Sequence, residues 1–399
     1  MHFTRRTFIK QAALLAASAH LPSPAAESAN QEPRHFRAAI IGHTGCGDYG
    51  HDHDLIFNGW ETISVVAVAD ADSTGRAKAA ARARALRQYS DYRQMLEKEK
   101  PDLVCVAPRW TGEHHAMALA ALRIGAHVYL EKPITQTLSQ ADELLSIAKA
   151  AGLKIVVAHQ MRLAENIMAL KRAIDGGLLG NLLEIRAHGK QDHRAGGEDL
   201  VVLGVHLFDL MRLFAGDALW CAARILQDGR EITAEDAHPA TEDIGPVAGD
   251  EIHAHFAFPA SVNATFISRA KYRDAAGPWG MELVGTQARV RILMAMEPRI
   301  LVRKRQGQGQ SVQEEPWLGS ENERSDRRSA SDLSPADANQ RVVKDWLNAI
   351  TDNREPVCSG YAAMKALEMV MAVFAAGLAR TRINFPLANR NHPLRPQPR

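Results

Sequence analysis

Cysteine is scarce in this chain, with 4 residues in 399, and no two of them stand at the spacing of a metal-binding or redox pair. A zinc knuckle and a disulfide framework are therefore not predicted. An excess of one charge is also missing, because 48 Lys and Arg face 46 Asp and Glu, for a formal net charge of +2. This balance argues against nucleic acid as a partner.

The remaining composition is that of a globular protein. Hydrophobic residues make up 46% and charged residues 24% of the chain, which excludes wholesale disorder and collagen-like repetition. At roughly 100 to 200 residues per domain, the length predicts two domains with sizeable cores.

The N-terminus has the order of an export signal. Arg5 and Arg6 precede a short apolar run at residues 12–19, and small residues follow near position 23. The run is too short to span a bilayer core of about 30 Å as a helix, so no stable membrane span is predicted. A basic arm or an uncleaved anchor is the alternative.

The paired arginines, with Phe8 two positions later, resemble the twin-arginine signal, whose translocon carries folded proteins. We therefore expect that translocon as a partner and a periplasmic or otherwise exported location.

The pattern of apolar runs changes near residue 159. Before it, apolar runs alternate with helical patterns, which predicts a Rossmann domain with a doubly wound parallel sheet. After it, strand patterns follow one another, which predicts an α+β domain with an open antiparallel sheet. The expected divisions are a signal peptide and connector at 1–35, a Rossmann domain at 36–158, a substrate and oligomerisation domain at 159–386, and a tail at 387–399.

A homo-oligomer is also expected. The strand patterns at 251–305 alternate weakly, which predicts apolar groups on both faces of the sheet and an outer face that a second copy covers.

A glycine cluster follows the first predicted strand. Gly42, Thr44, Gly45 and Gly47 are expected between strand and helix, where backbone N–H groups can approach a pyrophosphate. Asp70 ends the next apolar run, where a carboxylate accepts hydrogen bonds from a ribose 2′-OH and repels a 2′-phosphate. The cluster therefore predicts NAD rather than NADP; the alternative is a turn with a surface aspartate.

Further along the chain, Pro108 is followed by His114 and then by Glu131-Lys132-Pro133. This pattern resembles the hallmark of the Gfo/Idh/MocA oxidoreductases, the family of glucose-fructose oxidoreductase, inositol dehydrogenase and rhizopine catabolism proteins. The resemblance implies that Pro108, His114, Glu131 and Lys132 contact the cofactor and that Lys132 lies beside the reacting hydroxyl. Independently, a lysine after a parallel strand lies on the ligand side of such a sheet.

The family's second catalytic element resembles Asp-x-Gly-x-His-x-x-Asp, which aligns here with residues 202–209. His206 is present, but Val202 replaces the first aspartate and removes a carboxylate that would act with Lys132. Asp199, three residues earlier, is the candidate replacement, and a core-facing histidine is the alternative for His206. Catalytic residues are thus expected to be Lys132, His206 and Asp199, and substrate contacts to be Lys132, Lys190, His193, Arg194, His206 and Asp209.

The run His51-Asp52-His53-Asp54 offers metal-type ligands. Successive positions point to different sides and cannot close a tetrahedral site unaided, so no metal is predicted. The polar stretch at 241–251 is either a loop over the site or an ordinary hairpin connector.

Export restricts the chemistry, because a free nicotinamide pool is not expected outside the cytoplasm. The sequence therefore predicts an NAD(P)-dependent oxidoreductase that acts on a sugar or cyclic polyol with a tightly bound cofactor. A redox-neutral, NAD-dependent glycoside hydrolase or lyase is the alternative. Val202 leaves open a second alternative, a sugar-binding protein without catalytic activity.

Overall fold

The structure is a computed structural model that describes residues 34–272, 279–304, 314–317 and 334–395. The predicted twin-arginine signal and all but the end of the connector at 1–35 lie outside these residues, so both stay predictions.

The first domain is built on a six-stranded parallel sheet in the order β3-β2-β1-β4-β5-β6. Apart from the edge strand β3, its strands are apolar runs, because helices or loops cover both faces of a parallel sheet. This strand order is that of a dinucleotide-binding fold, as the sequence predicted. The strands are β1 (Phe36–Ile41), β2 (Ile63–Ala69), β3 (Arg87–Tyr89), β4 (Leu103–Val106), β5 (His127–Leu130) and β6 (Ile155–Val157).

Three of the four helices of this domain begin at capping side chains: Asp72 accepts a hydrogen bond from the N–H of Gly75, Asp91 from Arg93 and Thr137 from Gln140. The helices are α2 (Ser73–Ala83), α3 (Tyr92–Glu99), α4 (His114–Arg123) and α5 (Leu138–Ala151).

The prediction of a helix directly after the glycine cluster is wrong. Between β1 and β2 the chain makes turns and a single short 3-10 helix, η1 (His53–Leu55). The physical reason is a series of left-handed residues, with φ of 84° at Gly45, 88° at Gly47 and 52° at Asp48, which keeps the backbone out of the α-helical region.

The second domain contains a ten-stranded sheet in the order β17-β16-β15-β14-β7-β13-β12-β8-β18, with β9 paired to β8. The predicted antiparallel sheet is therefore mixed, because β7 inserts beside β13 in parallel while the other pairs are antiparallel. The strands are β7 (Leu182–His188), β8 (Trp220–Gln227), β9 (Arg230–Glu231), β12 (Glu251–Ala257), β13 (Asn263–Arg269), β14 (Gly280–Gly285), β15 (Ala288–Leu293), β16 (Arg299–Lys304), β17 (Glu315–Pro316) and β18 (Ile383–Asn384).

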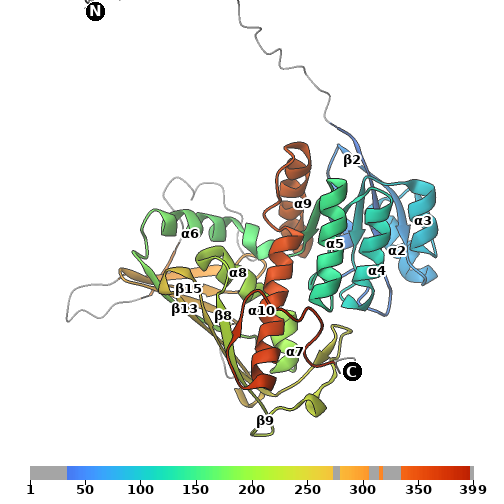
Figure 1. Ribbon diagram of the computed structural model, residues 1–399. Helices are drawn as coiled ribbons and strands as arrows, with labels where there is room; N and C mark the ends of the chain where they lie inside the picture. The colour runs from blue at the N-terminus through green and yellow to red at the C-terminus, as the bar shows by residue number, and fades with distance from the viewer. Residues whose placement is uncertain (1–33, 273–278, 305–313, 318–333, 396–399) are drawn as a thin grey trace, which may run out of the picture. The chain divides into compact units, whose positions relative to one another are not determined.

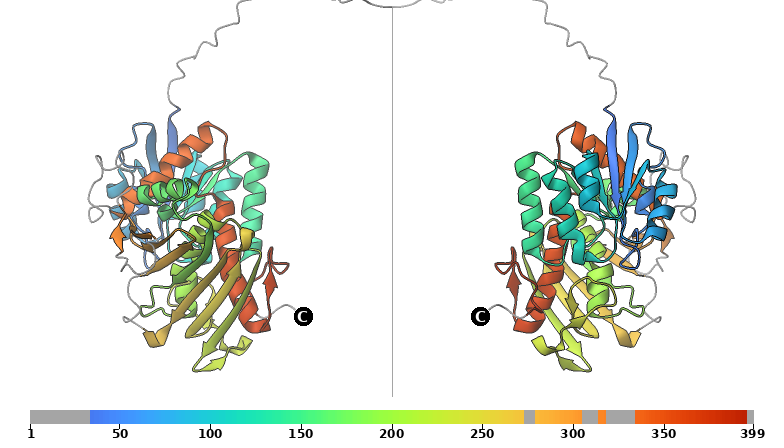
Figure 2. Two further views of the ribbon diagram at one scale, coloured as in Figure 1. Left: turned by 90° about the vertical axis from the view of Figure 1, so that its left-hand side faces the viewer. Right: turned by 90° about the vertical axis from the view of Figure 1, so that its right-hand side faces the viewer.

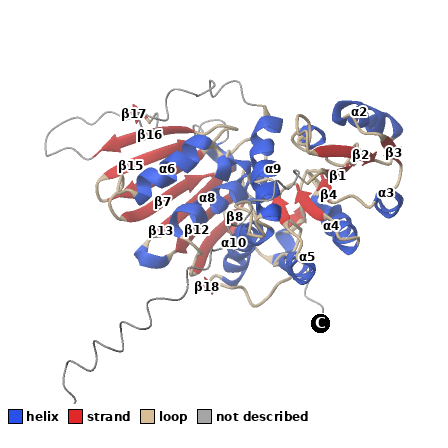
Figure 3. Ribbon diagram, turned by 90° about the horizontal axis from the view of Figure 1, so that it is seen from above, coloured by secondary structure: helices blue, strands red, loops and turns tan. Residues whose placement is uncertain are grey.

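Helices lie against one face of this sheet and leave the other open (Figure 3). In β12, Ile252, Ala254 and Phe256 point inward and are buried. Outward positions carry charged side chains such as Arg186 and Glu282 together with apolar ones such as Ile267 and Leu301, so the outer face is mixed. Oligomerisation through this face stays a prediction. The covering helices are α6 (Glu165–Asp175), α8 (Val205–Ala215) and α10 (Gly360–Ala379).

The C-terminal part of the chain packs on both sheets. Helix α9 (Pro335–Thr351) lies beside the strands of the first domain (Figure 2). Its Val342 and Trp346 join the core on one face of the parallel sheet. Helix α10, which contacts α5, α8 and β8 (Figure 1), is the one described helix long and apolar enough to cross a membrane, and 78% of its apolar window is buried.

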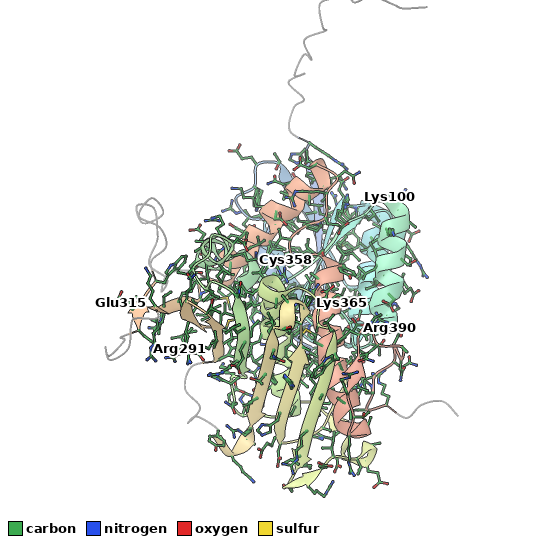
Figure 4. All side chains as sticks on the ribbon, turned by 60° about the vertical axis from the view of Figure 1, so that its left-hand side comes forward. Lys100, Arg291, Glu315, Cys358, Lys365 and Arg390 are labelled. Atoms are coloured by element: carbon green, nitrogen blue, oxygen red, sulfur yellow. The ribbon has the colours of Figure 1, made fainter. Side chains whose placement is uncertain are left out.

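The predicted tail at 387–395 is part of the fold as far as it is described. The Arg390 guanidinium bonds Asp142 of α5 at 2.6 Å and Glu368 of α10 at 2.5 Å, close to Lys365 (Figure 4). The segment therefore ties α5 to α10.

Candidate active site

The carboxyl end of β5 carries the Glu-Lys-Pro motif. The Lys132–Pro133 peptide bond is cis. Below it, the buried ring of His114 has its nitrogens 2.9 Å from the carbonyl oxygen of Pro133 and 2.7 Å from that of Pro108. His114, expected as a cofactor contact, thus braces the turn through both ring nitrogens.

Lys132 points into the second domain. Its Nζ donates a hydrogen bond to the carbonyl oxygen of Val202 at 3.3 Å, and its side chain is 8% exposed. Val202 lies in a π-helical stretch, Leu200–Gly204, that leads into α8, and such stretches are frequent at functional sites. The position that lacks the family's aspartate therefore still contacts the lysine, through its main chain.

Glu131 is the buried counter-ion of the site. Its carboxylate lies 3.8 Å from Lys132 Nζ, 3.1 Å from His53 Nε2 and 3.4 Å from His51 Nδ1. Burial alone would raise the pKa of Glu131, but these three neighbours lower it below its usual value. The carboxylate therefore stays ionised beside the lysine.

The histidines and the aspartates of the His-Asp-His-Asp motif contact different side chains. His51 and His53 face Glu131, whereas Asp52 and Asp54 both pair with Arg82, at 2.6 and 2.7 Å. The His53 side chain is fully buried, and that burial lowers its pKa to about 4. His51 is 34% exposed and links the Glu131 carboxylate to the surface.

His206, near the start of α8, completes the centre. Its ring centroid lies 5.3 Å from that of His159 and 5.9 Å from that of Trp279. Burial, followed by the charge of Lys132, holds the pKa of His206 well below its usual value. Burial also lowers the pKa of Lys132 itself. The site thus combines a neutral imidazole with an amine that loses its proton more readily than a lysine in water.

Asp199 has another function in this structure. Its carboxylate accepts hydrogen bonds from the N–H groups of Lys190 and Gln191, at 3.1 and 3.0 Å, and from Ser268 Oγ at 2.6 Å. Burial raises the pKa of Asp199, and these bonds partly offset the rise. Among the described residues no hydrogen bond or ion pair joins Asp199 to Lys132 or His206, so the geometry does not support the predicted catalytic role.

The predicted substrate contacts in the 190–194 loop differ in how far their side chains are exposed to solvent. The side chains of Lys190 and His193 are 51% and 70% exposed. Arg194 is held by Asp192 through bonds of 3.1 and 2.6 Å, and its charge acts on Lys132. Arg194 is therefore the member of this loop that the structure brings near the centre.

Asp209, also predicted as a substrate contact, is buried and paired with a cation. Arg162 donates to its carboxylate from Nε at 2.9 Å and from Nη2 at 2.8 Å. The pair fixes α8, and hence His206, against the end of the parallel sheet. Asp209 thus supports the site through Arg162.

The glycine loop is bound to the end of β2. The backbone N–H and the Oγ1 of Thr44 donate to Asp70, at 3.0 and 2.6 Å. Gly47 approaches β4 so closely that a Cβ would lie 2.5 Å from the N of Arg109, and a Cβ on Gly75 would lie 1.8 Å from Thr44 Oγ1. Both glycines are required for the loop to lie in this groove.

The loop and its surroundings fit a dinucleotide. The position of a Cβ on Gly45 faces open space, so a phosphate can approach the backbone there. A cavity of about 190 Å³ lies beside Asp70, where an adenosine half would fit, with Gly42, His43, Tyr92 and Met117 in its lining. The strict spacing Gly-x-Gly-x-x-Gly, which sequence reasoning missed, begins at Gly45 and ends at Gly50.

Several residues of the site were not predicted: His51, His53, His159, Trp279 and Arg109, whose charge acts on Lys132. His159 and Arg109 closely follow β6 and β4, so the rule that ligands bind at the carboxyl ends of parallel strands could have found them. Trp279 directly precedes β14, and no local sequence pattern indicates a role for it.

A parallel sheet of this order, a glycine loop at its edge and a buried lysine–histidine pair define a dinucleotide-binding oxidoreductase. Two family profiles agree: the NAD-binding Rossmann fold of an oxidoreductase family matches residues 36–159, and that family's C-terminal alpha/beta domain matches residues 171–384. The chain belongs to the Gfo/Idh/MocA family of NAD-binding oxidoreductases.

Named relatives act on sugars. The D-apiose dehydrogenase of Paraburkholderia graminis is 24% identical over 351 residues, 86% of this chain and 87% of that protein. The D-glucoside 3-dehydrogenase of Escherichia coli is 28% identical over 188 residues, 44% of this chain and 52% of that protein. Levoglucosan dehydrogenase, solved with NADH and L-sorbose, shares the fold with a TM-score of 0.74 at 17% identity, covering 89% of this chain and all of that one.

Proposed function

We propose that this protein oxidises a secondary hydroxyl of a sugar or cyclic polyol, with a tightly held NAD as the hydride acceptor. The observation that carries the proposal is the buried Lys132, held between the Glu131 carboxylate and the Val202 carbonyl oxygen, with its charge acting on His206. The related sugar dehydrogenases support the substrate class.

NAD supplies one element of the chemistry when bound, a nicotinamide ring that takes the hydride with both electrons of the substrate C–H bond. The residues of this chain must then remove the hydroxyl proton as the carbonyl forms. The lowered pKa of Lys132 favours the neutral amine, whose Nζ accepts that proton, and Glu131 stabilises the resulting ammonium at 3.8 Å. His206, held neutral by burial, can donate a hydrogen bond to the same oxygen.

A preference for NAD over NADP rests on Asp70. The side chain ends β2 and is fixed by Thr44 and by the N–H of Asp72, at 2.6 and 3.0 Å. Oδ2 accepts both bonds from Thr44 and Oδ1 accepts the bond from Asp72, so Oδ1 keeps a lone pair for a ribose hydroxyl, and the charge repels a 2′-phosphate.

Tight cofactor binding, export and a homo-oligomer complete the proposal. An exported enzyme that cannot rebind NAD must keep its dissociation slow. The connector at 21–35 contains Pro22, Pro24 and Pro33, which favour an extended arm able to close over the cofactor. If the arm is a clasp, truncation to Phe36 accelerates NAD loss; a mere spacer leaves the off-rate unchanged.

The test is a screen of the purified mature protein. We expect denaturation to release NAD, and free sugars, polyols or glycosides to reduce the bound cofactor. Release of an aglycone without net reduction would instead indicate redox-neutral glycoside cleavage. Sugar binding with neither signal would indicate a non-catalytic binder and overturn the proposal.

A further inference from the structure

A second cavity adjoins the proposed active site. It has a volume of about 470 Å³, within the range of small-molecule sites. Three segments line it: Trp110 ahead of α4, the hairpin formed by β10 (His238–Pro239) and β11 (Pro246–Val247) with its connecting loop, and Leu394 with Arg395 near the end of the described chain. We call it the Trp110 cavity.

Its walls are held in place. The carbonyl oxygen of Asp243 accepts hydrogen bonds from the N–H groups of Thr111 and Gly112, at 2.8 and 3.1 Å. The Asp243 carboxylate accepts a bond from Gln136 Nε2 at 2.7 Å, and a Cβ on Gly112 would lie 1.9 Å from it. Gln136 Oε1 in turn accepts a bond from Arg395 Nη2 at 2.6 Å. The loop at 241–251, left open by the sequence, is thus fastened over the first domain.

Glu242 joins this cavity to the reaction centre. Glu242 lines the cavity, and the N–H of its neighbour Thr241 donates to the Glu198 carboxylate at 3.1 Å, directly before the Leu200–Gly204 stretch that contacts Lys132. The charge of Glu242 also acts on Lys132 and Arg194. Within the described chain the Glu242 carboxylate makes no hydrogen bond or ion pair, so its oxygens are available to a ligand. A substrate that reaches Lys132 can therefore extend past Glu242 into the cavity.

The lining has the chemistry that recognises a pyranose ring. Trp110, Pro239, Pro246 and Leu394 offer apolar surface for the C–H faces of a sugar. Glu242 accepts hydroxyl protons, and the Arg395 N–H groups that do not bond Gln136 donate to hydroxyl oxygens.

We propose that the Trp110 cavity binds a second sugar residue, so that the substrate is a disaccharide or oligosaccharide end whose first residue is oxidised at Lys132. The inference rests on the proposed function and narrows it from sugars in general to glycosides. It assigns Trp110, Glu242 and Arg395 to the recognition of the neighbouring residue and leaves proton removal to Lys132.

The experiment compares kcat/KM of the mature, cofactor-loaded protein for a methyl glycoside and for the disaccharide with the same oxidised residue. We expect the disaccharide to be preferred. Trp110→Ala should lower the disaccharide-to-methyl-glycoside ratio roughly tenfold, as expected when an aromatic contact surface is removed. Trp220→Ala is the matched control, since Trp220 lies on β8 and contacts Arg382, and should leave the ratio unchanged.

Equal kcat/KM for the two substrates, or an unchanged ratio in Trp110→Ala, would overturn the inference. Calorimetric titration with the disaccharide separates this failure from failure of the proposed function. If neither compound is oxidised but the disaccharide binds wild type more tightly than Trp110→Ala, the cavity assignment holds and the oxidation proposal fails. NADH affinity, measured in the same variants, should stay constant; a fall in Trp110→Ala would place the tryptophan at the cofactor instead.

Discussion

Replacing Glu131 with glutamine tests how the site sets the proton affinity of Lys132. The change keeps the size of the side chain but removes the charge 3.8 Å from Lys132 Nζ. Without that charge the ammonium is less stable, so the pKa of Lys132 falls further below its ordinary value. A base must be neutral to accept a proton, so the acid limb of the oxidation profile should move to lower pH.

The magnitude follows from the distance. Two charges about 4 Å apart interact by about 4 kcal/mol at an effective dielectric constant of about 20, or roughly 3 pH units. His51 and His53 share the same carboxylate, so part of this interaction is lost to competition. We expect a shift of about 1 to 2 pH units.

The assay is kcat/KM for sugar oxidation as a function of pH, followed by the absorbance of the reduced nicotinamide. Glu99→Gln is the matched control, because Glu99 is a buried carboxylate that pairs with Arg37 and Arg87 away from Lys132. It should lower stability and leave the profile in place. An acid limb in Glu131→Gln that is unmoved, or moved to higher pH, would refute the reasoning.

Four further results are expected. Lys132→Met should lower kcat by roughly 10²- to 10⁴-fold, and undiminished turnover would remove Lys132 from catalysis. Asp70→Asn should raise affinity for NADP relative to NAD by roughly tenfold in equilibrium titrations, and an unchanged ratio would contradict the ribose assignment. His53 has a folded pKa of about 4, below its unfolded value of about 6.5, so its contribution to stability is complete above about pH 6.5 and is lost as the pH falls toward 4, by about 3 kcal/mol. Urea unfolding of His53→Asn should show a weaker pH dependence across that interval, and the wild-type slope in the variant would count against it. Truncation to Phe36 should accelerate NAD release, measured by dilution into an excess of labelled NAD, and an unchanged rate would make the connector a spacer.

The sequence predicted those parts of the fold that depend on local pattern. Helix α10 (Gly360–Ala379), for example, is an apolar run that begins after a typical capping residue, Ser359, whose side chain accepts a bond from the N–H of Ala362. The glycine loop shows the limit of such reasoning. The left-handed backbone at Gly47 and Asp48 prevents a helix there, and no periodicity in the sequence indicates that conformation.

In the site, too, features that follow from local sequence could be predicted, and features that depend on distant residues could not. Lys132 and Asp70 could be predicted because each closely follows a parallel strand, and the carboxyl ends of those strands share one edge. The hydrogen bond of Asp199 to Ser268 could not be foreseen, because Ser268 lies 69 residues away on β13. The same holds for the contact of His114 with the carbonyl oxygen of Pro133, 19 residues on. Long-range partners decide whether a polar side chain is free to act, and they are visible only in the fold.

The most direct test of the central claim is isotope transfer from a sugar to the cofactor that the protein carries. The mature protein is mixed with a glycoside that carries deuterium on the carbon of the oxidised hydroxyl, then denatured, and the released nucleotide is analysed by mass spectrometry. The account predicts NADH with one deuterium, formed by wild type and not by Lys132→Met. Release of a nucleotide without deuterium across the sugars and glycosides screened, or release of no nicotinamide nucleotide at all, would contradict it.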